Sequence, residues 1–531
     1  MKSLRLLTGG AAVALTATLV ACGGSTPDPA ANPSIENVVV AVGALPDSLT
    51  PSPWGGSASH VVLSGLGSQL LEYKVGASDG RTCPEPSTEL AGRLAESAKP
   101  SPDGTGVVIT LRKLTSQFGN TLSAEDIRWS FDIGMKRQPV MRGTLKSSGF
   151  NVDDLVKVID ERTLQLNTTG LTSYTEESLQ NNLFYIHDST EAKKHVTAED
   201  PTANDWLSKN LADYSGWKLE EFTPGASLTV TADPAWEGTR GTVKRVAVKA
   251  VQSTATRSQL VESGEVQVAN GFEYDQYKSL EKSPGVTVLN CASQTRDTMM
   301  INTTSGPLAD PKVRHAVSMA IDREALVKGA YAGFGEPAGS IFPMVEGSAI
   351  YKFNKAEAKK LLAEAGYGNG FPMTLSYSVT RPGPVAAKSA VLLQSMLKDV
   401  GIDVQLQNVA SSTDFSTALI EGRYQAVLYS EPIVIADPAF YSYAFYGTGA
   451  PSNSTGWSSP EFDKARSELS ATPDQETDKR TSLLKKMASL VDDGAPILSL
   501  VETRGVLVTK TGLPGAVPLT NGQINFNALG R

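Results

Sequence analysis

Residues 372–429 constrain the fold most, because strand and helix patterns alternate there with short connections. Such a β-α-β-α-β run builds a mostly parallel sheet through right-handed crossovers. The run therefore predicts an α/β fold for this part of the chain. Its three strands are expected at 372–379, 402–409 and 424–429, and its two helices at 385–400 and 413–421.

Polar side chains follow each of the three expected strands. Arg381 comes after the first strand, Ser411 and Ser412 after the second, and Glu431 after the third. Because ligands of parallel sheets bind beyond the carboxyl ends of the strands, we expect these loops to face a ligand cleft. The alternative for each side chain is an ordinary solvated position in a loop.

Capping patterns predict helices elsewhere in the chain. Ser123 with Asp126, and Asn354 with Glu357, have the spacing of capping boxes. Asp310 precedes a proline at the first helical position, which also marks a helix start. Further strands are expected at 37–42, 107–111, 228–231 and 243–251, and a further helix at 253–263.

The start of the chain has the pattern of an export signal. A short positive start precedes an apolar run at 11–21, and residues 19–22 read Leu-Val-Ala-Cys, which is a lipobox. The run is too short to span a roughly 30 Å hydrocarbon core, so the expected anchor is lipid, including palmitate, on Cys22. We expect residues 1–21 to be a signal peptide, residues 22–34 to be a lipidated tether, and the exported protein to be held at the extracytoplasmic side of the cell membrane.

Composition limits the classes of function. The formal net charge is −8, and it becomes −10 when the two cationic leader residues, Lys2 and Arg5, are removed. The chain has no basic run and no later apolar stretch of spanning length, which argues against nucleic-acid binding and against a multispan membrane role. A length of 531 residues predicts two or three domains rather than one core.

Cys83 and Cys291 are the cysteines that remain besides Cys22. Oxidising conditions outside the cytoplasm allow them to form a disulfide if their Cα atoms lie within about 7 Å. Two separate buried thiols are the alternative. Neither cysteine has a partner at metal-ligand spacing, so we expect no metal site and no cofactor.

One motif resembles an enzyme's active-site turn. Residues 76–80, Gly-Ala-Ser-Asp-Gly, match the Gly-x-Ser-x-Gly elbow of hydrolases and follow a strand-like segment at 70–75. An elbow must lead into a helix, whereas Pro84 and Pro86 follow here and prevent one. The sequence contains no phosphate loop and no HExxH motif either. We therefore expect a turn at 76–80 and a protein that is not an enzyme.

A series of short motifs stands in one order along the chain. The most specific segment is 302–343, which contains Asn302-Thr303, the run 310–317 and the run Ala-Ile-Asp-Arg at 320–323. Together the motifs resemble the family 5 extracellular solute-binding proteins, which include the oligopeptide, dipeptide and nickel receptors of ABC importers. The other matching segments are 122–131, 217–225, 260–266, 351–366, 401–404, 422–424, 437–438 and 460–463.

The resemblance implies a periplasmic-binding-protein-like type II fold, in which two hinged lobes close over a ligand and an extra α+β domain is attached. The strand ends predicted to bind a ligand fall inside the implied closing lobe. Lobe I is expected at 35–72, 220–290 and 496–531, the extra domain II at 73–219, and the ligand-closing lobe III at 291–495.

The resemblance also implies the function. The protein would act as a monomer that captures a small solute, with a peptide as the leading class, and delivers it to an ABC permease driven by a separate ATPase subunit. Aromatic walls and a few polar anchors suit such a cleft, and the candidates are Trp54, Tyr429, Glu431, Asp437 and Trp457. The alternatives are core packing for the aromatic residues and capping of the turn at Pro438 for Asp437.

One position departs from the family's pattern. Peptide receptors of the family hold the ligand amine with a carboxylate that stands three residues before an acidic residue followed by proline. In this sequence the acidic residue is Asp437, and the position three residues before it is Val434. Glu431 lies near enough to supply the charge instead. Because fold alone does not define function, the alternative is a receptor-shaped lipoprotein that no longer imports and instead regulates or scaffolds cell-envelope assembly.

Overall fold

The computed structural model describes residues 35–51, 57–85, 87–342, 349–379, 383–431, 435–450, 452–473, 476–519 and 523–531. The predicted signal peptide, the lipidation site Cys22 and the tether therefore lie outside the described residues. Trp54, Arg381 and Val434 also lie outside them. The predictions for all of these positions stay predictions.

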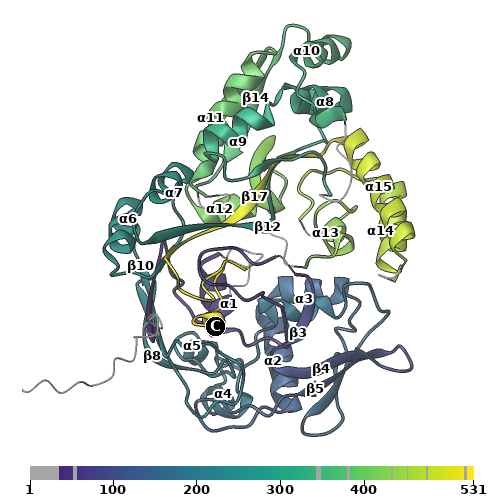
Figure 1. Ribbon diagram of the computed structural model, residues 1–531. Coiled ribbons are helices and arrows are strands. Elements are labelled where there is room, and N and C mark those ends of the chain that lie inside the picture. Colours follow the sequence, from purple (N-terminus) through teal and green to yellow (C-terminus); the bar gives the residue numbers. More distant parts are fainter. Residues whose placement is uncertain are drawn as a thin grey trace, which may run out of the picture. The chain divides into compact units, whose positions relative to one another are not determined.

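One mixed sheet of eleven strands runs through the described part of the chain (Figure 1). Its order is β15-β14-β16-β12-β17-β11-β1-β10-β9-β8, and β13 pairs with β17. The strands are β1 (Asn37–Val42), β8 (Trp217–Thr223), β9 (Ser227–Ala232), β10 (Arg245–Ala250), β11 (Val268–Ala269), β12 (Val286–Ile301), β13 (Glu336–Pro337), β14 (Phe371–Tyr377), β15 (Ile402–Asn408), β16 (Ala426–Glu431) and β17 (Ile497–Lys510).

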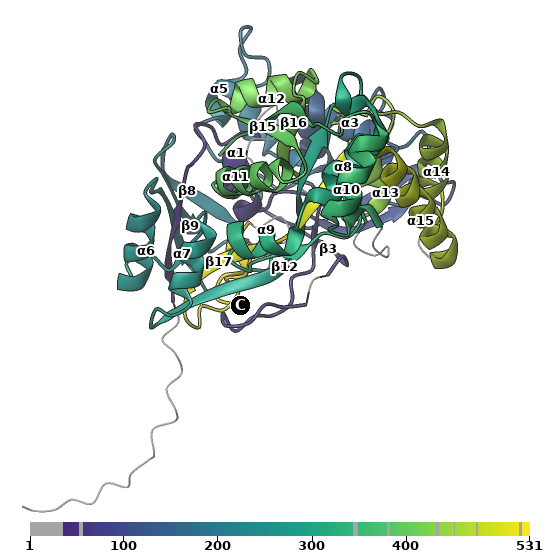
Figure 2. The same ribbon diagram turned by 90° about the horizontal axis from the view of Figure 1, so that it is seen from above.

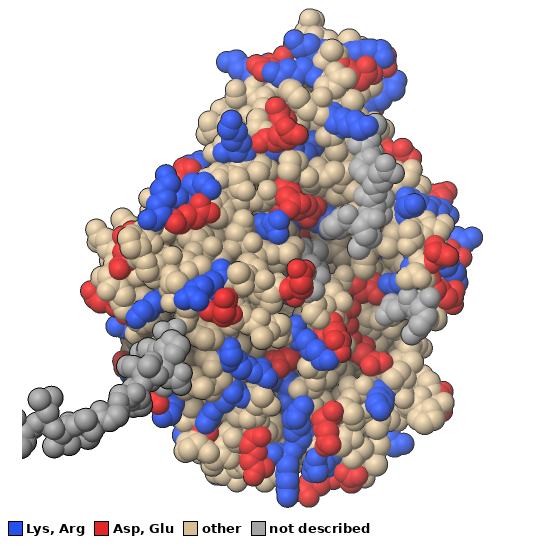
Figure 3. Space-filling view, in the orientation of Figure 1, with Lys and Arg blue, Asp and Glu red and all other residues tan. Residues whose placement is uncertain are grey.

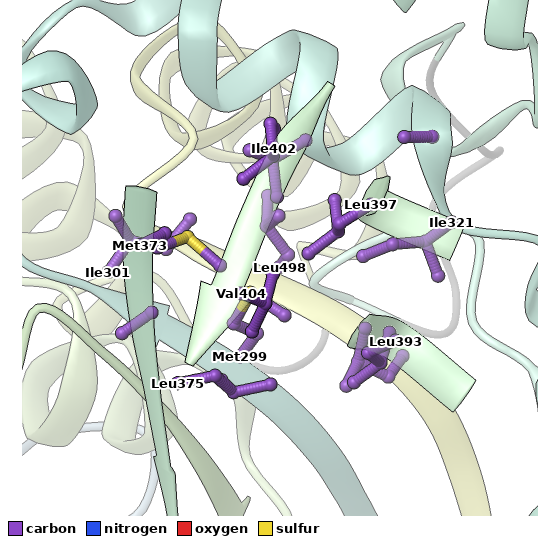
Figure 4. Packing of buried hydrophobic residues seen from close by; sticks show 14 of the residues in the cluster. Met299, Ile301, Ile321, Met373, Leu375, Leu393, Leu397, Ile402, Val404 and Leu498 are labelled. Carbon is purple, nitrogen blue, oxygen red and sulfur yellow. The ribbon is translucent and has the colours of Figure 1, made fainter. Parts of the chain in front are cut away.

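The predicted β-α-β-α-β run is confirmed as β14, α11 (Val385–Lys398), β15, α12 (Ser412–Ile420) and β16. Strand β14 pairs in parallel with both β15 and β16, so the carboxyl ends of the three strands meet at one edge. Figure 2 shows α11 and α12 next to β15 and β16. Leu375 and Val404 from the strands pack with Leu393 and Leu397 of α11 (Figure 4). Burial of this apolar face holds helix and sheet together.

A second core lies at the other end of the sheet. Here β1 runs parallel to β10 and β11, while β9 pairs antiparallel with both β8 and β10. Val40, Leu228 and Leu507 belong to one buried cluster, which we call the β1 core. The cluster of Leu375, Leu393 and Leu498 is called the β14 core.

Strands β12 and β17 connect these two cores. They pair antiparallel along almost their whole length, from Val286 opposite Lys510 to Met300 opposite Ile497. Leu289 of β12 packs in the β1 core, whereas Met299 of the same strand packs in the β14 core. The register shifts between Ala292 and Arg296 and again between Asp297 and Thr298, in the part of the ribbon that lies between the two cores.

A separate four-stranded sheet has the order β4-β5-β7-β6. Its strands are β4 (Ala95–Pro100), β5 (Gly106–Leu111), β6 (Val156–Val158) and β7 (Thr163–Asn167). It packs on α2 (Ala124–Arg137) around Ile109 and Phe131. The predicted capping box of Ser123 and Asp126 starts α2, because each side chain binds the other's backbone amide. Before this sheet in the sequence, β2 (Leu71–Tyr73) and β3 (Leu90–Gly92) pair antiparallel with each other.

The other predicted helix starts are confirmed as well. The side chain of Asp310 accepts a hydrogen bond from the Lys312 amide, and that of Asn354 accepts one from the Glu357 amide. The remaining α-helices are α1 (Ser57–Leu66), α3 (Pro139–Ser147), α4 (Ser189–Ala192), α5 (Asn204–Leu207), α6 (Thr254–Ser263), α7 (Tyr274–Leu280), α8 (Pro311–Ala320), α9 (Arg323–Ala330), α10 (Lys355–Glu364), α13 (Pro438–Phe445), α14 (Pro460–Ser470) and α15 (Thr477–Gly494).

Cys83 and Cys291 form a disulfide, with their Cα atoms 5.3 Å apart. Cys291 lies on β12 within the β1 core, and Cys83 packs against the same core from the loop between β2 and β3. Of the two alternatives that the sequence left open, the structure contains the bonded one. The bond fastens that loop to the strand that links the two cores.

Removing this disulfide should destabilise the protein. The bond closes a loop with a sequence separation of 208 residues, so its loss frees the unfolded chain, and we expect a double variant Cys83→Ser, Cys291→Ser to lose about 2–5 kcal/mol. Urea unfolding followed by circular dichroism measures this loss. The wild-type protein in reductant serves as the control and should match the variant. Equal midpoints with and without reductant would contradict the expectation.

Candidate functional site

The carboxyl ends of β14, β15 and β16 define the candidate site. Beyond β15, Ser411 is exposed and its hydroxyl accepts a hydrogen bond from the Asp414 amide at 3.1 Å, which starts α12. Ser412 is the first residue of α12, and its side chain lies outside the described part. Ser411 thus has a capping function, and a ligand contact by either serine stays a prediction.

Glu431 ends β16 and is fully buried. Its carboxylate oxygen Oε2 lies 3.7 Å from Nε of Arg296, which is also buried. In the sheet, Arg296 of β12 stands opposite Glu431 on one side and opposite Glu502 of β17 on the other. A guanidinium group is therefore enclosed between two acidic residues at the register shift, and we call Arg296, Glu431 and Glu502 the buried charge cluster.

The charges of this cluster stabilise one another. Burial works against the Arg296 charge, but the carboxylates of Glu502 and Glu431 outweigh it and raise the pKa of Arg296. Burial raises the pKa of Glu502, while the positive charge of Arg296 opposes that rise. The cluster contains one cationic and two acidic side chains, so its formal charge is negative when both acids are ionised.

Tyrosine side chains of α13 and its end surround the cluster. The guanidinium carbon of Arg296 lies 4.8 Å from the ring centre of Tyr441, and the guanidinium also donates to the carbonyl of Ile341. The hydroxyl oxygens of Tyr441 and Tyr446 are buried and have no hydrogen-bond partner among the described residues. Burial, together with the negative charge of Glu431, raises the pKa of Tyr446 and keeps its hydroxyl neutral.

Tyr429 and Trp457 pack into a core around Phe440 and Phe462. The Tyr429 ring lies 6.4 Å from that of Phe445, and the Trp457 ring meets Phe462 edge-on at 5.4 Å. Both side chains have the packing role that was the alternative to ligand contact. A ligand contact by either stays a prediction.

Asp437 caps helix α13 and pairs with α15. Its carboxylate accepts a hydrogen bond from the Ala439 amide at 2.7 Å and lies 2.8 Å from the guanidinium of Arg480. Arg480 also donates to the backbone carbonyls of Leu469 and Thr472. The capping role that the sequence allowed is thus present, and a ligand contact by Asp437 stays a prediction.

The segment that matched a hydrolase elbow is a turn. The Ser78 hydroxyl donates to the Thr82 carbonyl at 3.0 Å and accepts from the Gly80 amide at 3.1 Å. Gly80 has a φ of +72°, and a Cβ there would lie 2.2 Å from the Leu513 carbonyl oxygen. No helix follows Gly80 in the described residues up to Glu85.

In the described part of the chain, no three His, Cys, Asp or Glu side chains lie together as a metal site requires. None of the described helices is long and apolar enough to cross a membrane. On the face shown in Figure 3, acidic and basic side chains are interspersed rather than gathered into one patch.

The fold is the α/β fold of the periplasmic-binding-protein-like type II class. A dipeptide-binding protein from Pseudoalteromonas sp. SM9913, solved with Met-Leu, superposes with a TM-score of 0.79 at 19% identity, covering 93% of this chain and 99% of that one. DppA of Helicobacter pylori, solved with the peptide STSA, has a TM-score of 0.77 at 23% identity, covering 93% and 97%. The predicted type II fold is confirmed.

The family follows from the sequence comparison. The family described as "Bacterial extracellular solute-binding proteins, family 5 Middle" matches residues 89–453, more than half of the chain, and the protein belongs to this family. The "Probable D,D-dipeptide-binding periplasmic protein DdpA" of Escherichia coli K12 is 25% identical over 528 residues, covering 97% of this chain and 98% of that protein. The glutathione-binding protein GsiB of the same strain is 35% identical over 179 residues, about a third of each chain (33% and 34%).

Sequence reasoning missed Arg296 and Glu502. Arg296 stands in a polar stretch of β12, next to Thr295 and Asp297, so nothing in the local sequence indicated that its side chain is buried. The partner Glu502 lies on β17, far along the chain, and no local pattern connects the two residues.

Loss of the Asp437 carboxylate should destabilise the packing of α13 against α15. Asp437→Ala removes both the helix cap and the carboxylate that pairs with the buried Arg480 charge, so we expect a loss of about 3–5 kcal/mol in urea unfolding. Asp437→Asn is the matched control, because it keeps the capping oxygen and loses the charge, and its cost should be smaller. Equal costs for the two variants would show that the ion pair contributes nothing.

Proposed function

We propose that this protein captures a peptide between two lobes and presents it to the permease of an ABC importer. The observation that carries the proposal is the buried charge cluster at the carboxyl edge of the parallel strands. A free peptide has an ammonium group at one end and a carboxylate at the other. A site with one guanidinium and two carboxylates offers a charge-assisted partner to each end.

The arrangement of the cores supports two closing lobes. We propose lobe I at 35–72, 220–290 and 496–531, lobe III at 291–495, and the extra domain at 73–219. The β1 core and the β14 core belong to different proposed lobes, and β12 and β17 join them. The register shift between Ala292 and Arg296 is the proposed hinge, next to the charge cluster. Closing would exclude water and so strengthen every polar contact to the ligand.

The names of the relatives favour a short peptide as ligand. DdpA is named for D,D-dipeptides, and the two solved neighbours hold Met-Leu and the four-residue peptide STSA. Other neighbours of similar fold were solved with agropinic acid or with a nickel–histidine complex. We therefore propose a dipeptide to tetrapeptide as the cargo, bound through its charged ends.

The proposal includes export and lipid anchoring at Cys22. The lipobox at residues 19–22 supports this anchor, which would hold the receptor next to its permease. Mass spectrometry of the membrane-extracted protein should find a mature chain that begins at Cys22 and carries acyl groups. A chain that begins at Met1, or a Cys22 without lipid, would contradict the anchor.

Ligand binding tests the proposal directly. Small molecules released from the natively purified protein should include a peptide, and calorimetry with Met-Leu and with D-alanyl-D-alanine should detect binding. Glu431→Gln should weaken peptide binding about tenfold to a hundredfold, because a charge-assisted hydrogen bond contributes about 1.5–3 kcal/mol. The matched control is Glu421→Gln, an exposed residue paired with Arg423, which should bind as the wild type does.

The outcome also separates the two candidate functions. A folded protein that yields no co-purified solute and binds no peptide would overturn the import proposal. It would favour the alternative, a receptor-shaped lipoprotein that regulates or scaffolds cell-envelope assembly.

A further inference from the structure

A compact hydrogen-bonded contact joins Tyr73 and Glu177 to Ala436, which lies between β16 and α13. Tyr73, the last residue of β2, donates its hydroxyl to Oε1 of Glu177 at 2.5 Å. The backbone amide of Ala436 donates to the same oxygen at 2.6 Å and to the Tyr73 hydroxyl oxygen at 3.0 Å. Tyr73, Glu177 and Ala436 come from three separate segments, and we call their contact the carboxyl latch.

Neighbouring contacts extend the latch into an interface. The Tyr174 ring meets the Phe440 ring of α13 edge-on at 5.5 Å, and the Ser173 amide donates to the Ser470 carbonyl at 3.0 Å. Tyr174 is buried in the same apolar core as Phe440. Residues 173–177 therefore dock onto the start of α13 and the end of α14.

The latch acts on the loop that connects two parts of the candidate site. Glu431 of the buried charge cluster lies before this loop, and α13, which carries Tyr441 against Arg296, begins directly after it. Fixing the Ala436 amide, two residues before α13 begins, therefore fixes the start of the helix that carries Tyr441. In the proposed lobe division, Tyr73 and Glu177 lie on one side of the cleft and Ala436 lies on the other.

We propose that Glu177 and Tyr73 are positioning residues for ligand capture, and that they form a proton-sensitive latch which holds Ala436 and the start of α13 in the closed protein. The proposal rests on the proposed closing of two lobes over a ligand. Neither residue needs to touch the ligand. They act through the Ala436 amide on α13, which carries Tyr441 against Arg296.

The proton sensitivity follows from where Glu177 lies. Burial raises the pKa of Glu177 to about 7, and the negative charge of Asp437 adds to the rise, although hydrogen bonds from Tyr73 and from the Ala436 and Asp437 amides oppose it. The charged groups around Glu177 are Asp437 and Glu176. The carboxylate of Asp437 is balanced by the guanidinium of Arg480, which lies 2.8 Å from it. Burial raises the pKa of Glu176 as well. The phenol of Tyr73 stays neutral, because burial raises its pKa.

In an open protein Glu177 would meet water and titrate near its ordinary pKa of 4.5. Closing therefore takes up a proton between that pH and about 7. The latch is fully favoured in acid and loses this advantage as the pH rises through about 7. Between pH 6 and pH 8.5 the linkage amounts to about a tenfold change in the closing equilibrium.

Hydrogen exchange of the mature, ligand-free protein tests the latch without a ligand. Peptides covering residues 435–440 should be about tenfold better protected at pH 6 than at pH 8.5, after correction for intrinsic exchange. Glu177→Gln should show the same protection at both pH values, because its amide oxygen still accepts both hydrogen bonds and takes up no proton. Glu199→Gln, which changes an exposed residue, should behave as the wild type does.

A second variant keeps the test decisive. Tyr73→Phe removes the phenol from the latch and should lower the protection of residues 435–440 at both pH values. The proposal is wrong if wild-type protection does not depend on pH, or if Glu177→Gln keeps the wild-type pH dependence. It is also wrong if Tyr73→Phe leaves the protection unchanged.

Calorimetry with Met-Leu then separates the latch from the peptide proposal. Wild-type affinity should fall about tenfold from pH 6 to pH 8.5, and the affinity of Glu177→Gln should not change. If the exchange results hold while Met-Leu and D-alanyl-D-alanine fail to bind, the latch stands and the peptide proposal fails. If binding has the same pH dependence in both proteins, the peptide proposal stands and the latch is wrong.

Discussion

The pairing of β12 with β17 is the interaction on which the rest of the structure depends. These two long strands pack in the β1 core at one end and in the β14 core at the other, so one ladder of backbone hydrogen bonds joins both. The ladder loses its register between Ala292 and Arg296, where fewer regular hydrogen bonds resist bending. An irregular part of the ribbon and the buried charge cluster therefore coincide.

Burying the Arg296 charge in this part of the ribbon is electrostatically unfavourable. A guanidinium buried without partners is several kcal/mol unfavourable, so Arg296 can occupy this position only because Glu431 and Glu502 face it from both neighbouring strands. Bending the ribbon would change the spacing of these three charges. A charged ligand that completes the cluster would thus favour one bend over others, which is how binding energy can drive closing.

Local sequence patterns predicted the elements of the fold well. The alternation at 372–429, the caps at Ser123, Asp310 and Asn354, and the turn at 76–80 each depend on residues close together in the chain. The strand-end rule named three loops whose strands do end at one edge of the sheet, and a ligand site at this edge stays a prediction. It did not say which way a side chain points, and Glu431 is buried against Arg296 rather than placed in a solvated loop.

Contacts between distant segments were beyond local patterns. The sequence left the Cys83–Cys291 bond open, because the spacing of two cysteines says nothing about their distance in space. Arg296 with Glu502, and Glu177 with the Ala436 amide, are likewise pairs that only the tertiary fold brings together. Asp437 combines both kinds of contact. The proline that follows it predicted its capping role, whereas nothing near it in the sequence predicted its ion pair with Arg480.

The disulfide connects the latch to the ribbon. Tyr73 ends β2, and the loop that follows this strand is bonded through Cys83 to Cys291, directly before the register shift of β12. The segment that carries Tyr73 is thereby fastened to the β1 core, while Ala436 belongs to the chain that follows β16. In the proposed closing motion, Tyr73 would stay with the β1 core and Ala436 would move with the β14 core. The hydrogen bond between them would then form in one arrangement only, so that this contact would distinguish a closed protein from an open one.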